Sequence, residues 1–329
     1  MELLNKKILM IAPKYYGYED YIRQCLEKQG ATVYCIYENL DEVSFFYRFI
    51  YVYVPKKKRE VLDRYYIRNL KKFGRDIDYV FAIRASSLSE KILHFMKKYY
   101  SKECQYIMYQ WDGIKNNPNA LSISKEFDKV FTFDLTDSHE MGWTYRPLFF
   151  INDLLDIRRK RTNDVLYICS LHSQRVDVLN KLKKICEKKG LTLHSHMYSK
   201  KLIYYKRKYL NKKEEYINSS DRDVSFHSLS IKDSYKLYGN SKVVVDFTHP
   251  GQTGYTMRTI ECVGNKCKLV TNNEFIKTAD FYDPHNVYIY SGTNVSIPEE
   301  FITQPYTEVD SGLYKYYSLE GWVETIFGA

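Results

Sequence analysis

The chain has 329 residues, 44% of them hydrophobic and 27% charged, which excludes an intrinsically disordered protein and fits two globular domains. Its 50 basic and 40 acidic residues give a formal net charge of +10, which suits anionic partners such as nucleotide phosphates or acidic lipid headgroups. Because the sequence contains no DNA- or RNA-binding motif, we expect no nucleic-acid partner. Seven cysteines without a CxxC pair or zinc spacing favour a reducing cytoplasm, and no apolar run approaches the ~18 residues of a membrane-spanning helix.

The first half of the chain alternates strands with helices. We expect strands over 7–12, 32–37, 79–83, 105–110 and 129–133. We expect helices over 18–29, 42–54, 57–72 and 88–100. Strands that are nearly all apolar and are separated by helices indicate a parallel sheet covered on both faces.

The second half restarts the same pattern. We expect strands over 164–169 and 192–196, from residue 243, and over 268–271. We expect helices over 175–189, 202–216, 231–239, 256–264 and 319–327. The segment 153–163 carries four consecutive basic residues and is interpreted as a linker. The sequence therefore predicts an α/β protein with Rossmann-like domains at 1–152 and 164–317, followed by a last helix within 318–329.

The most informative segment is the apolar strand at 243–245 with the turn and helix that follow it. The turn contains Gly251 and Gly254, and the helix presents Arg258 and Glu261 one turn apart. Free backbone N–H groups and the positive end of the helix form a ready site for an anion such as a diphosphate. Glu261 could accept hydrogen bonds from ribose hydroxyls. The alternative is an ordinary strand–helix–strand connection without a ligand.

Five motifs in order along the chain resemble segments of GT-B glycosyltransferases, especially bacterial enzymes of capsule and lipopolysaccharide synthesis. They are YQWDGIKN at 109–116, FDKVFTFD at 127–134, Tyr167–Ser170 with His172 and Arg175, Gln252–Gly254 with Met257, Arg258 and Glu261, and Thr271–Asn272. The family has Ser after Trp-Asp where this chain has Gly113, which puts a hydroxyl role there in doubt. The resemblance implies two Rossmann-like domains facing across a cleft, with the acceptor on the N-terminal domain, the nucleotide-sugar on the C-terminal domain, and a last helix that returns to the N-terminal domain.

Ligands of open α/β sheets bind beyond the carboxyl ends of the strands, which selects Asp112 and Asp134 as candidate catalytic carboxylates. Asp112 could take the proton of an acceptor hydroxyl if configuration inverts; the alternatives are a loop cap or an ion pair with Lys115. Asp134 is the second candidate, with N-capping of the turn at 136–138 as the alternative. On the acceptor side we also expect three aromatic residues: Tyr15, Tyr16 and Trp111.

On the donor side, Arg175 and Arg258 are expected to pair with the diphosphate, because a guanidinium binds phosphate oxygens in bidentate fashion. Either arginine could instead be a surface ion-pair partner. His172 and His249 are candidate phosphate or sugar contacts, with structural roles as the alternative. The remaining expected donor contacts are Ser170, Gln252, Thr253, Gly254, Tyr255, Thr256 and Glu261.

These expectations describe a cytoplasmic glycosyltransferase that moves a sugar from a nucleotide donor, UDP-linked by default, to a surface polysaccharide or lipid-linked oligosaccharide. We expect no cofactor and no metal ion, because no strand leads into an Asp-x-Asp element. The alternatives are other nucleotide-sugar chemistry such as epimerisation, and a non-catalytic nucleotide- or glycan-binding partner. The aromatic run 45–53 with the basic residues 56–59 predicts peripheral contact with the anionic inner face of the cell membrane.

Overall fold

The structure, a computed structural model, describes residues 3–14, 16–38, 57–155, 160–248 and 253–328. The predictions for the helix over 42–54, for the membrane contact of 45–53 with Lys56, and for Tyr15, His249 and Gln252 lie outside these residues. The chain divides into two compact units: unit 1 is Met1–Leu148 with Leu319–Ala329, and unit 2 is Phe149–Ser318.

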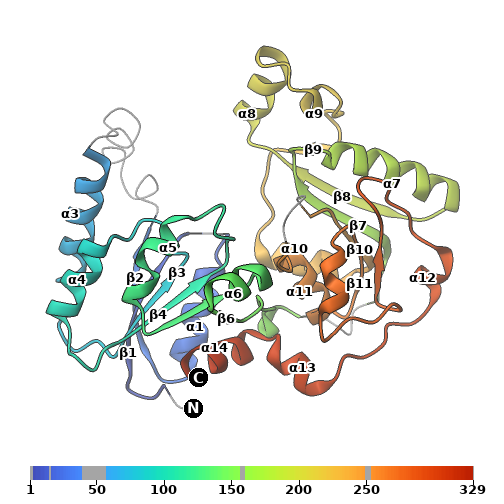
Figure 1. Cartoon of the computed structure of the whole chain (residues 1–329). Helices are drawn as coiled ribbons and strands as arrows, with labels where there is room; N and C mark the ends of the chain where they lie inside the picture. Colours follow the sequence, from blue (N-terminus) through green and yellow to red (C-terminus); the bar gives the residue numbers. More distant parts are fainter. Residues whose placement is uncertain (1–2, 15, 39–56, 156–159, 249–252, 329) are drawn as a thin grey trace. The chain divides into compact units, whose positions relative to one another are not determined.

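Unit 1 is built on a six-stranded parallel sheet in the order β2-β1-β3-β4-β5-β6 (Figure 1). The strands are β1 (Lys7–Ala12), β2 (Thr32–Tyr37), β3 (Tyr79–Ile83), β4 (Gln105–Gln110), β5 (Lys129–Thr132) and β6 (Thr144–Tyr145). The helices are α1 (Tyr18–Lys28), α3 (Lys58–Leu70), α4 (Glu90–Tyr99), α5 (Asn119–Ile123), α6 (Leu135–Met141) and α14 (Leu319–Gly328). The strand order reverses between β1 and β3, and such a switch point is where open α/β sheets bind ligands.

Successive side chains of β3 point to opposite faces of the sheet, and both faces are covered by apolar residues. Val80 and Ala82 belong to the apolar core that includes residues of α3 and α4. Tyr79 and Phe81 point to the other face, where both rings pack against Phe327 of α14 at centroid distances of 5.4 and 5.2 Å. Because all five residues of β3 are buried, this strand reads as a continuous apolar run rather than an alternating one.

The last helix, α14, is part of unit 1. Its Trp322 is fully buried and meets Tyr109 of β4 edge to face at 4.7 Å. Aromatic pairs of this geometry contribute about 0.5–1.5 kcal/mol beyond the area they bury. The helix also packs along α1. It therefore completes the apolar core on one face of the unit 1 sheet.

Unit 2 repeats the architecture with a parallel sheet in the order β12-β11-β10-β7-β8-β9. The strands are β7 (Asn163–Ser170), β8 (Leu193–Tyr198), β9 (Val224–Ser225), β10 (Ser241–Asp246), β11 (Lys268–Thr271) and β12 (Val287–Ile289). The helices are α7 (Arg175–Lys189), α8 (Lys201–Tyr205), α9 (Glu214–Ile217), α10 (Ile231–Gly239), α11 (Met257–Gly264), α12 (Glu299–Thr303) and α13 (Ser311–Tyr316). Here the strand order reverses between β7 and β10.

The two units divide at a different place from the predicted linker at 153–163. The boundary lies between Leu148 and Phe149, and Asn163 is already part of β7. The apolar run that starts at Phe149 is buried, and the N–H of Ile151 donates to the hydroxyl of Tyr235 at 2.8 Å. The boundary between the units is therefore set by the burial of this apolar run in unit 2, and the basic composition of the segment that follows does not mark it.

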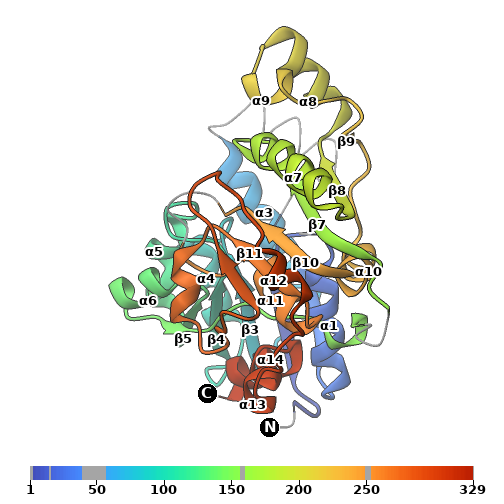
Figure 2. The ribbon, with the colours of Figure 1, turned by 90° about the vertical axis from the view of Figure 1, so that its right-hand side faces the viewer.

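The predicted helix over 202–216 is broken in the structure. It consists of α8, the π-helical turn η5 (Lys206–Leu210) and α9, and Lys212 between the last two has a left-handed backbone with φ 46°. These elements form a helical hairpin that stands beyond β9 at one end of unit 2 (Figure 1, Figure 2). Among the described residues, no helix combines the length and the apolar character that crossing a membrane requires.

Candidate functional site

Three adjacent strands of unit 2 end at the same edge of the sheet. β7 ends at Ser170, β10 at Asp246 and β11 at Thr271, and the switch point lies between the first two. The loops that follow these strands must therefore lie side by side. Most of the donor-side residues that the sequence predicts and that the structure describes lie at this edge, in the loops or the first turns of the helices that follow these strands.

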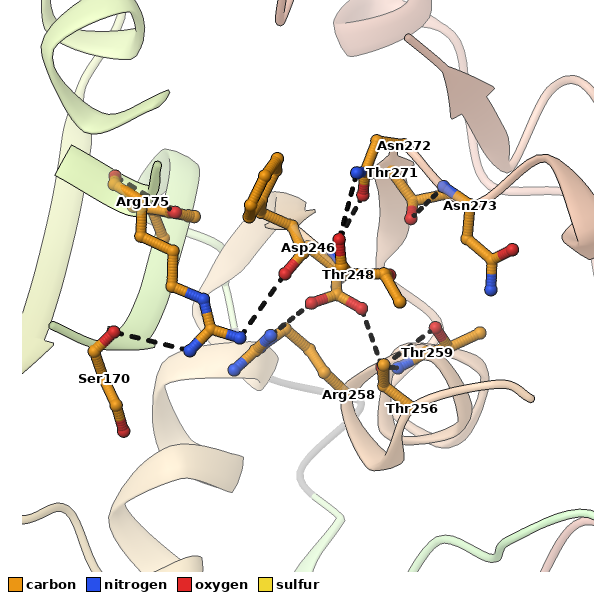
Figure 3. Close-up of polar contacts among 12 residues, drawn as sticks. Ser170, Arg175, Asp246, Thr248, Thr256, Arg258, Thr259, Thr271, Asn272 and Asn273 are labelled. Carbon is orange, nitrogen blue, oxygen red and sulfur yellow. Dashed lines mark hydrogen bonds and ion pairs between the residues drawn. The ribbon is translucent and has the colours of Figure 1, made fainter. Parts of the chain in front are cut away.

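A buried carboxylate holds helix α11 against the end of β10 (Figure 3). Asp246 is 1% exposed and forms an ion pair with Arg258. Its other oxygen accepts a hydrogen bond of 2.7 Å from the hydroxyl of Thr256. Thr256 is also the N-cap of α11, because the same hydroxyl accepts from the N–H of Thr259 at 3.1 Å. One side chain, Asp246, thus positions both the start of the helix and its first arginine.

Arg258 is held as the counter-ion of Asp246. Burial opposes the charge on the guanidinium, but the Asp246 carboxylate, together with the smaller effects of Tyr238 and Cys169, outweighs it and raises the pKa of Arg258. The side chain is 19% exposed, and its Nε is buried without a hydrogen-bond partner among the described residues. The predicted contact of Arg258 with a diphosphate stays a prediction, and any such contact would start from a cation that is already paired.

Arg175 spans the switch point from the first residue of α7 (Figure 3). It donates to the carbonyl of Ser170 at 3.4 Å, to the carbonyl of Phe247 at 3.5 Å and to Nε2 of His172 at 2.7 Å. Because a guanidinium only donates, this nitrogen of His172 is unprotonated, and Nδ1 carries the proton that it shares with Ser173 at 3.0 Å. Within the described part of the chain, Arg175 pairs with no carboxylate.

Two amide side chains fix the loops after β10 and β11. Asn272 clasps the backbone of Thr248, accepting from its N–H at 2.7 Å and donating to its carbonyl at 3.1 Å. Asn273 is buried and donates to the carbonyl of Gly254 at 3.5 Å. The half-buried Thr253 lies just before this glycine. These bonds fix the backbone of the loops at this edge of the sheet.

Two predicted donor contacts lie inside the fold. Tyr255 is 4% exposed and its hydroxyl shares a hydrogen bond of 3.2 Å with Thr278. Glu261 is 2% exposed, and its carboxylate accepts a hydrogen bond from Tyr238 in α10. Burial raises the pKa of Tyr238, and the nearby Glu261 carboxylate raises it further. A nucleotide contact by either residue stays a prediction.

In unit 1, the end of β3 carries strained backbone. Arg84 and Ala85 have φ of +67° and +55°, a left-handed conformation that costs roughly 1 kcal/mol or more per non-glycine residue. Three amides hold them: the carbonyl of Arg84 accepts from Gln110 at 2.8 Å and from Asn117 at 2.6 Å, and that of Ala85 accepts from Asn119 at 3.0 Å. Gln110 and Asn117 are themselves buried and hydrogen-bonded to each other at 2.9 Å.

This strained turn aims Arg84 at Asp112, the predicted catalytic carboxylate. Arg84 Nε lies 2.8 Å from Asp112 Oδ2, and the two side chains are 32% and 36% exposed. Asp112 therefore has an arginine partner from the neighbouring strand end, where the sequence suggested Lys115. The carboxylate stays accessible to solvent, unlike that of Asp246.

Sequence reasoning missed Glu38, which follows β2 and is 4% exposed. Its carboxylate accepts from the hydroxyl of Ser86 at 3.2 Å and from the N–H and hydroxyl of Ser87 at 3.3 Å. Burial raises the pKa of Glu38 to about 7, against these hydrogen bonds and the charge of Arg84, which lower it. The signal that could have found it is its position directly after a strand end.

The remaining residues predicted for catalysis and for acceptor contact in unit 1 do not belong to the Arg84–Asp112 ion pair. Asp134 caps α6: its Oδ1 accepts from the N–H of Thr136 at 2.9 Å and of Asp137 at 3.1 Å, which confirms the capping alternative. A catalytic role for Asp134 stays a prediction. Trp111 is half-buried directly after β4, and Tyr16 is 57% exposed after β1. In the described residues, no group of three or more His, Cys, Asp or Glu side chains could hold a metal ion.

No protein-family model matches the chain, and no curated protein matches it. Solved structures share its fold. A glycosyltransferase from Rickettsia africae has a TM-score of 0.53 at 12% identity over 98% of this chain and 88% of that chain. HepE of Anabaena in complex with UDP and glucose has 0.57 at 11% over 98% and 99%. The UDP-GlcNAc 2-epimerase of Neisseria meningitidis bound to UDP-GlcNAc has 0.55 at 9% over 98% and 98%. The predicted GT-B architecture of two Rossmann-like sheets is thereby confirmed.

Proposed function

We propose that the protein is a glycosyltransferase that moves a sugar from a UDP-linked donor to a surface polysaccharide, of the capsule or lipopolysaccharide kind, or to its lipid-linked precursor. The observation that carries the proposal is the edge of unit 2 at the switch point. There Arg175, which pairs with no carboxylate among the described residues, donates to the carbonyl of Phe247 directly after β10, the strand that precedes α11. UDP is the proposed nucleotide because HepE, which shares the fold, is in complex with it.

In this proposal, Arg175 and Arg258 act differently on the donor. Asp246 already neutralises Arg258, so Arg258 fixes the start of α11, whose positive N-terminal end faces the diphosphate. Arg175 supplies the cation that meets the phosphate oxygens. When the bond between sugar and diphosphate breaks, negative charge grows on the leaving UDP, and a fixed guanidinium stabilises that charge. Ser170, His172, Thr253 and Thr256 complete the proposed donor contacts.

On the acceptor side, Asp112 acts as a general base. The acceptor hydroxyl oxygen bonds to the anomeric carbon, its proton passes to Asp112, the bond from the anomeric carbon to the diphosphate oxygen breaks, and UDP departs. Arg84 holds the carboxylate in place at 2.8 Å while leaving it accessible. Tyr16 and Trp111 are the proposed acceptor contacts. A general base of this kind contributes about 10²–10⁴ to the rate.

The fold alone does not separate sugar transfer from other chemistry on the same donors, because the similar protein from Neisseria meningitidis is a 2-epimerase. A non-catalytic nucleotide- or glycan-binding partner is the third reading. Peripheral membrane contact through 45–53 and 56–59 remains part of the proposal.

A thermal-shift screen with UDP, GDP and CMP tests the proposal, followed by assays of UDP release from UDP-glucose and UDP-GlcNAc. We expect UDP to raise the melting temperature, and Arg175→Ala to weaken UDP binding roughly ten- to a hundredfold. Lys184→Ala, on an exposed face of the same helix, is the matched control. Release of an epimerised sugar would support the epimerase, and nucleotide binding without turnover would support a non-catalytic nucleotide-binding partner. No response to any nucleotide would overturn both enzymes and the nucleotide-binding partner, leaving only a glycan-binding partner.

A further inference from the structure

We infer that the helical hairpin of unit 2, residues 200–217, is a docking surface for an anionic lipid bilayer. Large apolar side chains gather there in the open. Of the eleven such side chains that are exposed among the described residues, six lie in the hairpin: Leu202, Ile203, Tyr205, Tyr209, Leu210 and Ile217. Leu202 and Leu210 are 86% and 78% exposed, so water covers nearly their whole surface in the free protein.

The charge of the hairpin complements an anionic surface. Residues 200–217 contain two acidic residues, Glu214 and Glu215, and seven basic ones: Lys200, Lys201, Lys206, Arg207, Lys208, Lys212 and Lys213. Lys208 is already paired with Asp221, so six basic residues are left to meet an anionic surface. Lysines near an anionic membrane contribute about 1 kcal/mol each, and apolar side chains between them enter the headgroup region. Basic and apolar residues that lie together on one exposed element meet both requirements.

The inward face of the hairpin explains why these side chains point outward. Tyr204 and Tyr216 are buried, and the hydroxyl of Tyr216 donates to the carbonyl of Leu171 at 2.9 Å. Lys208 turns inward and donates to Tyr204 at 2.7 Å and to the carbonyl of Ser219 at 3.0 Å. The hairpin is therefore anchored to unit 2, and its apolar outer residues are displayed by a fixed element.

The position and the side-chain types favour a bilayer over other partners. In both views the hairpin stands beyond β9, at the end of unit 2 (Figure 1, Figure 2). A nucleic acid would gain from the stacked pair Tyr205 and Tyr209, but it has no use for the exposed leucines. A second copy of the chain would bring two basic hairpins together, and like charges oppose that contact. The inference adds a surface to the proposed function and does not depend on sugar chemistry.

Co-sedimentation with vesicles of phosphatidylcholine and phosphatidylglycerol in equal parts tests the inference. We expect the full chain to bind these vesicles at low salt and not vesicles of phosphatidylcholine alone. The combined change Lys201→Gln, Lys206→Gln and Lys212→Gln should weaken binding roughly a hundredfold. The control variant with Lys184→Gln, Lys188→Gln and Lys232→Gln loses the same charge from exposed positions elsewhere on unit 2. It should bind the vesicles much more strongly than the hairpin variant does.

Leu202→Ser with Leu210→Ser tests the apolar part and should weaken binding at least tenfold, since each leucine loses its transfer from water. Both side chains are exposed, so folding is not at risk, and the UDP thermal shift of these variants should match the unchanged protein. The inference is overturned if the unchanged chain ignores anionic vesicles, if the leucine variant binds them equally well, or if the hairpin instead governs binding to a single-stranded oligonucleotide or dimerisation in sedimentation velocity. Vesicle binding without any UDP response would refute the proposed function and leave this inference standing.

Discussion

In unit 2, the carboxylate at the end of β10 is 1% exposed and pairs with Arg258, whereas in unit 1 the carboxylate after β4 is 36% exposed and pairs with Arg84. The backbone differs too. The N-cap Thr256 has an ordinary extended backbone with φ −70°, while Arg84 and Ala85 are both left-handed.

This difference teaches how one architecture divides two tasks. A buried ion pair sets the position of a helix start, because removing either partner leaves an uncompensated charge. A half-exposed pair held by strained backbone adds little stability, yet it keeps the Asp112 carboxylate oriented and open to solvent. Strain of this kind is found where geometry serves chemistry, and here it lies next to Asp112.

Breaking the buried pair should have the largest effect on stability. Asp246→Asn keeps the shape of the side chain but leaves Arg258 without its counter-ion, so we expect the free energy of unfolding to fall by about 3–5 kcal/mol. Urea unfolding followed by circular dichroism measures it. A loss below about 1 kcal/mol would show that water relieves the charge of Arg258.

Glu38 makes the edge of unit 1 sensitive to pH. Its pKa in the folded protein is about 7, above the ordinary value of 4.5, so its contribution to stability is full below about pH 4.5 and is lost as the pH rises through 7. Glu38→Gln keeps an acceptor for Ser87 without the charge. We expect the variant to be more stable than the unchanged protein by up to roughly 3 kcal/mol at about pH 8, with the difference vanishing near pH 4.5. If the difference in unfolding free energy between the two proteins stays constant from about pH 4.5 to 8, the raised pKa of Glu38 is refuted.

Asn117→Ala and Asn272→Ala compare the two edges through matched amides. Each variant loses two amide contacts, to Arg84 and Gln110 in unit 1 and to Thr248 in unit 2, and should cost about 1–3 kcal/mol. We expect Asn117→Ala to lower turnover, because it releases the strained turn, and Asn272→Ala to weaken UDP binding instead. If both variants changed turnover and UDP binding to the same extent, the proposed difference between the sheet edges of unit 1 and unit 2 would be refuted.

Much of the fold could be predicted because it depends on local patterns. The strands at 7–12, 32–37, 79–83, 105–110 and 268–271 have the predicted bounds, since each is a largely apolar run bounded by helices or turns. The short strands β6, β9 and β12 were missed, because two or three residues carry no periodicity. The break at Lys212 was missed because its left-handed backbone has no signal in the sequence.

The sequence could place the candidate residues at strand ends, but it could not identify the partners of their side chains. The strand-end rule found Asp112, Arg175 and the β10–α11 segment, since it needs only the order of elements. It could not pair Arg258 with Asp246, nor Glu38 with the serines 48 and 49 residues further on, because such contacts depend on how separate loops pack. The strained turn escaped notice because neither of its residues is a glycine.

The smallest effect on stability and the largest on chemistry are expected from the same change, Asp112→Asn. The pair with Arg84 is about one-third exposed, so its loss should cost below about 1 kcal/mol of unfolding free energy. The central measurement is the rate of UDP release by this variant at saturating UDP-sugar, with UDP affinity checked in parallel. The account predicts release slower by roughly 10²–10⁴ with nearly unchanged affinity. Release at the unchanged rate, or a loss of UDP affinity that matches the loss of rate, would contradict it.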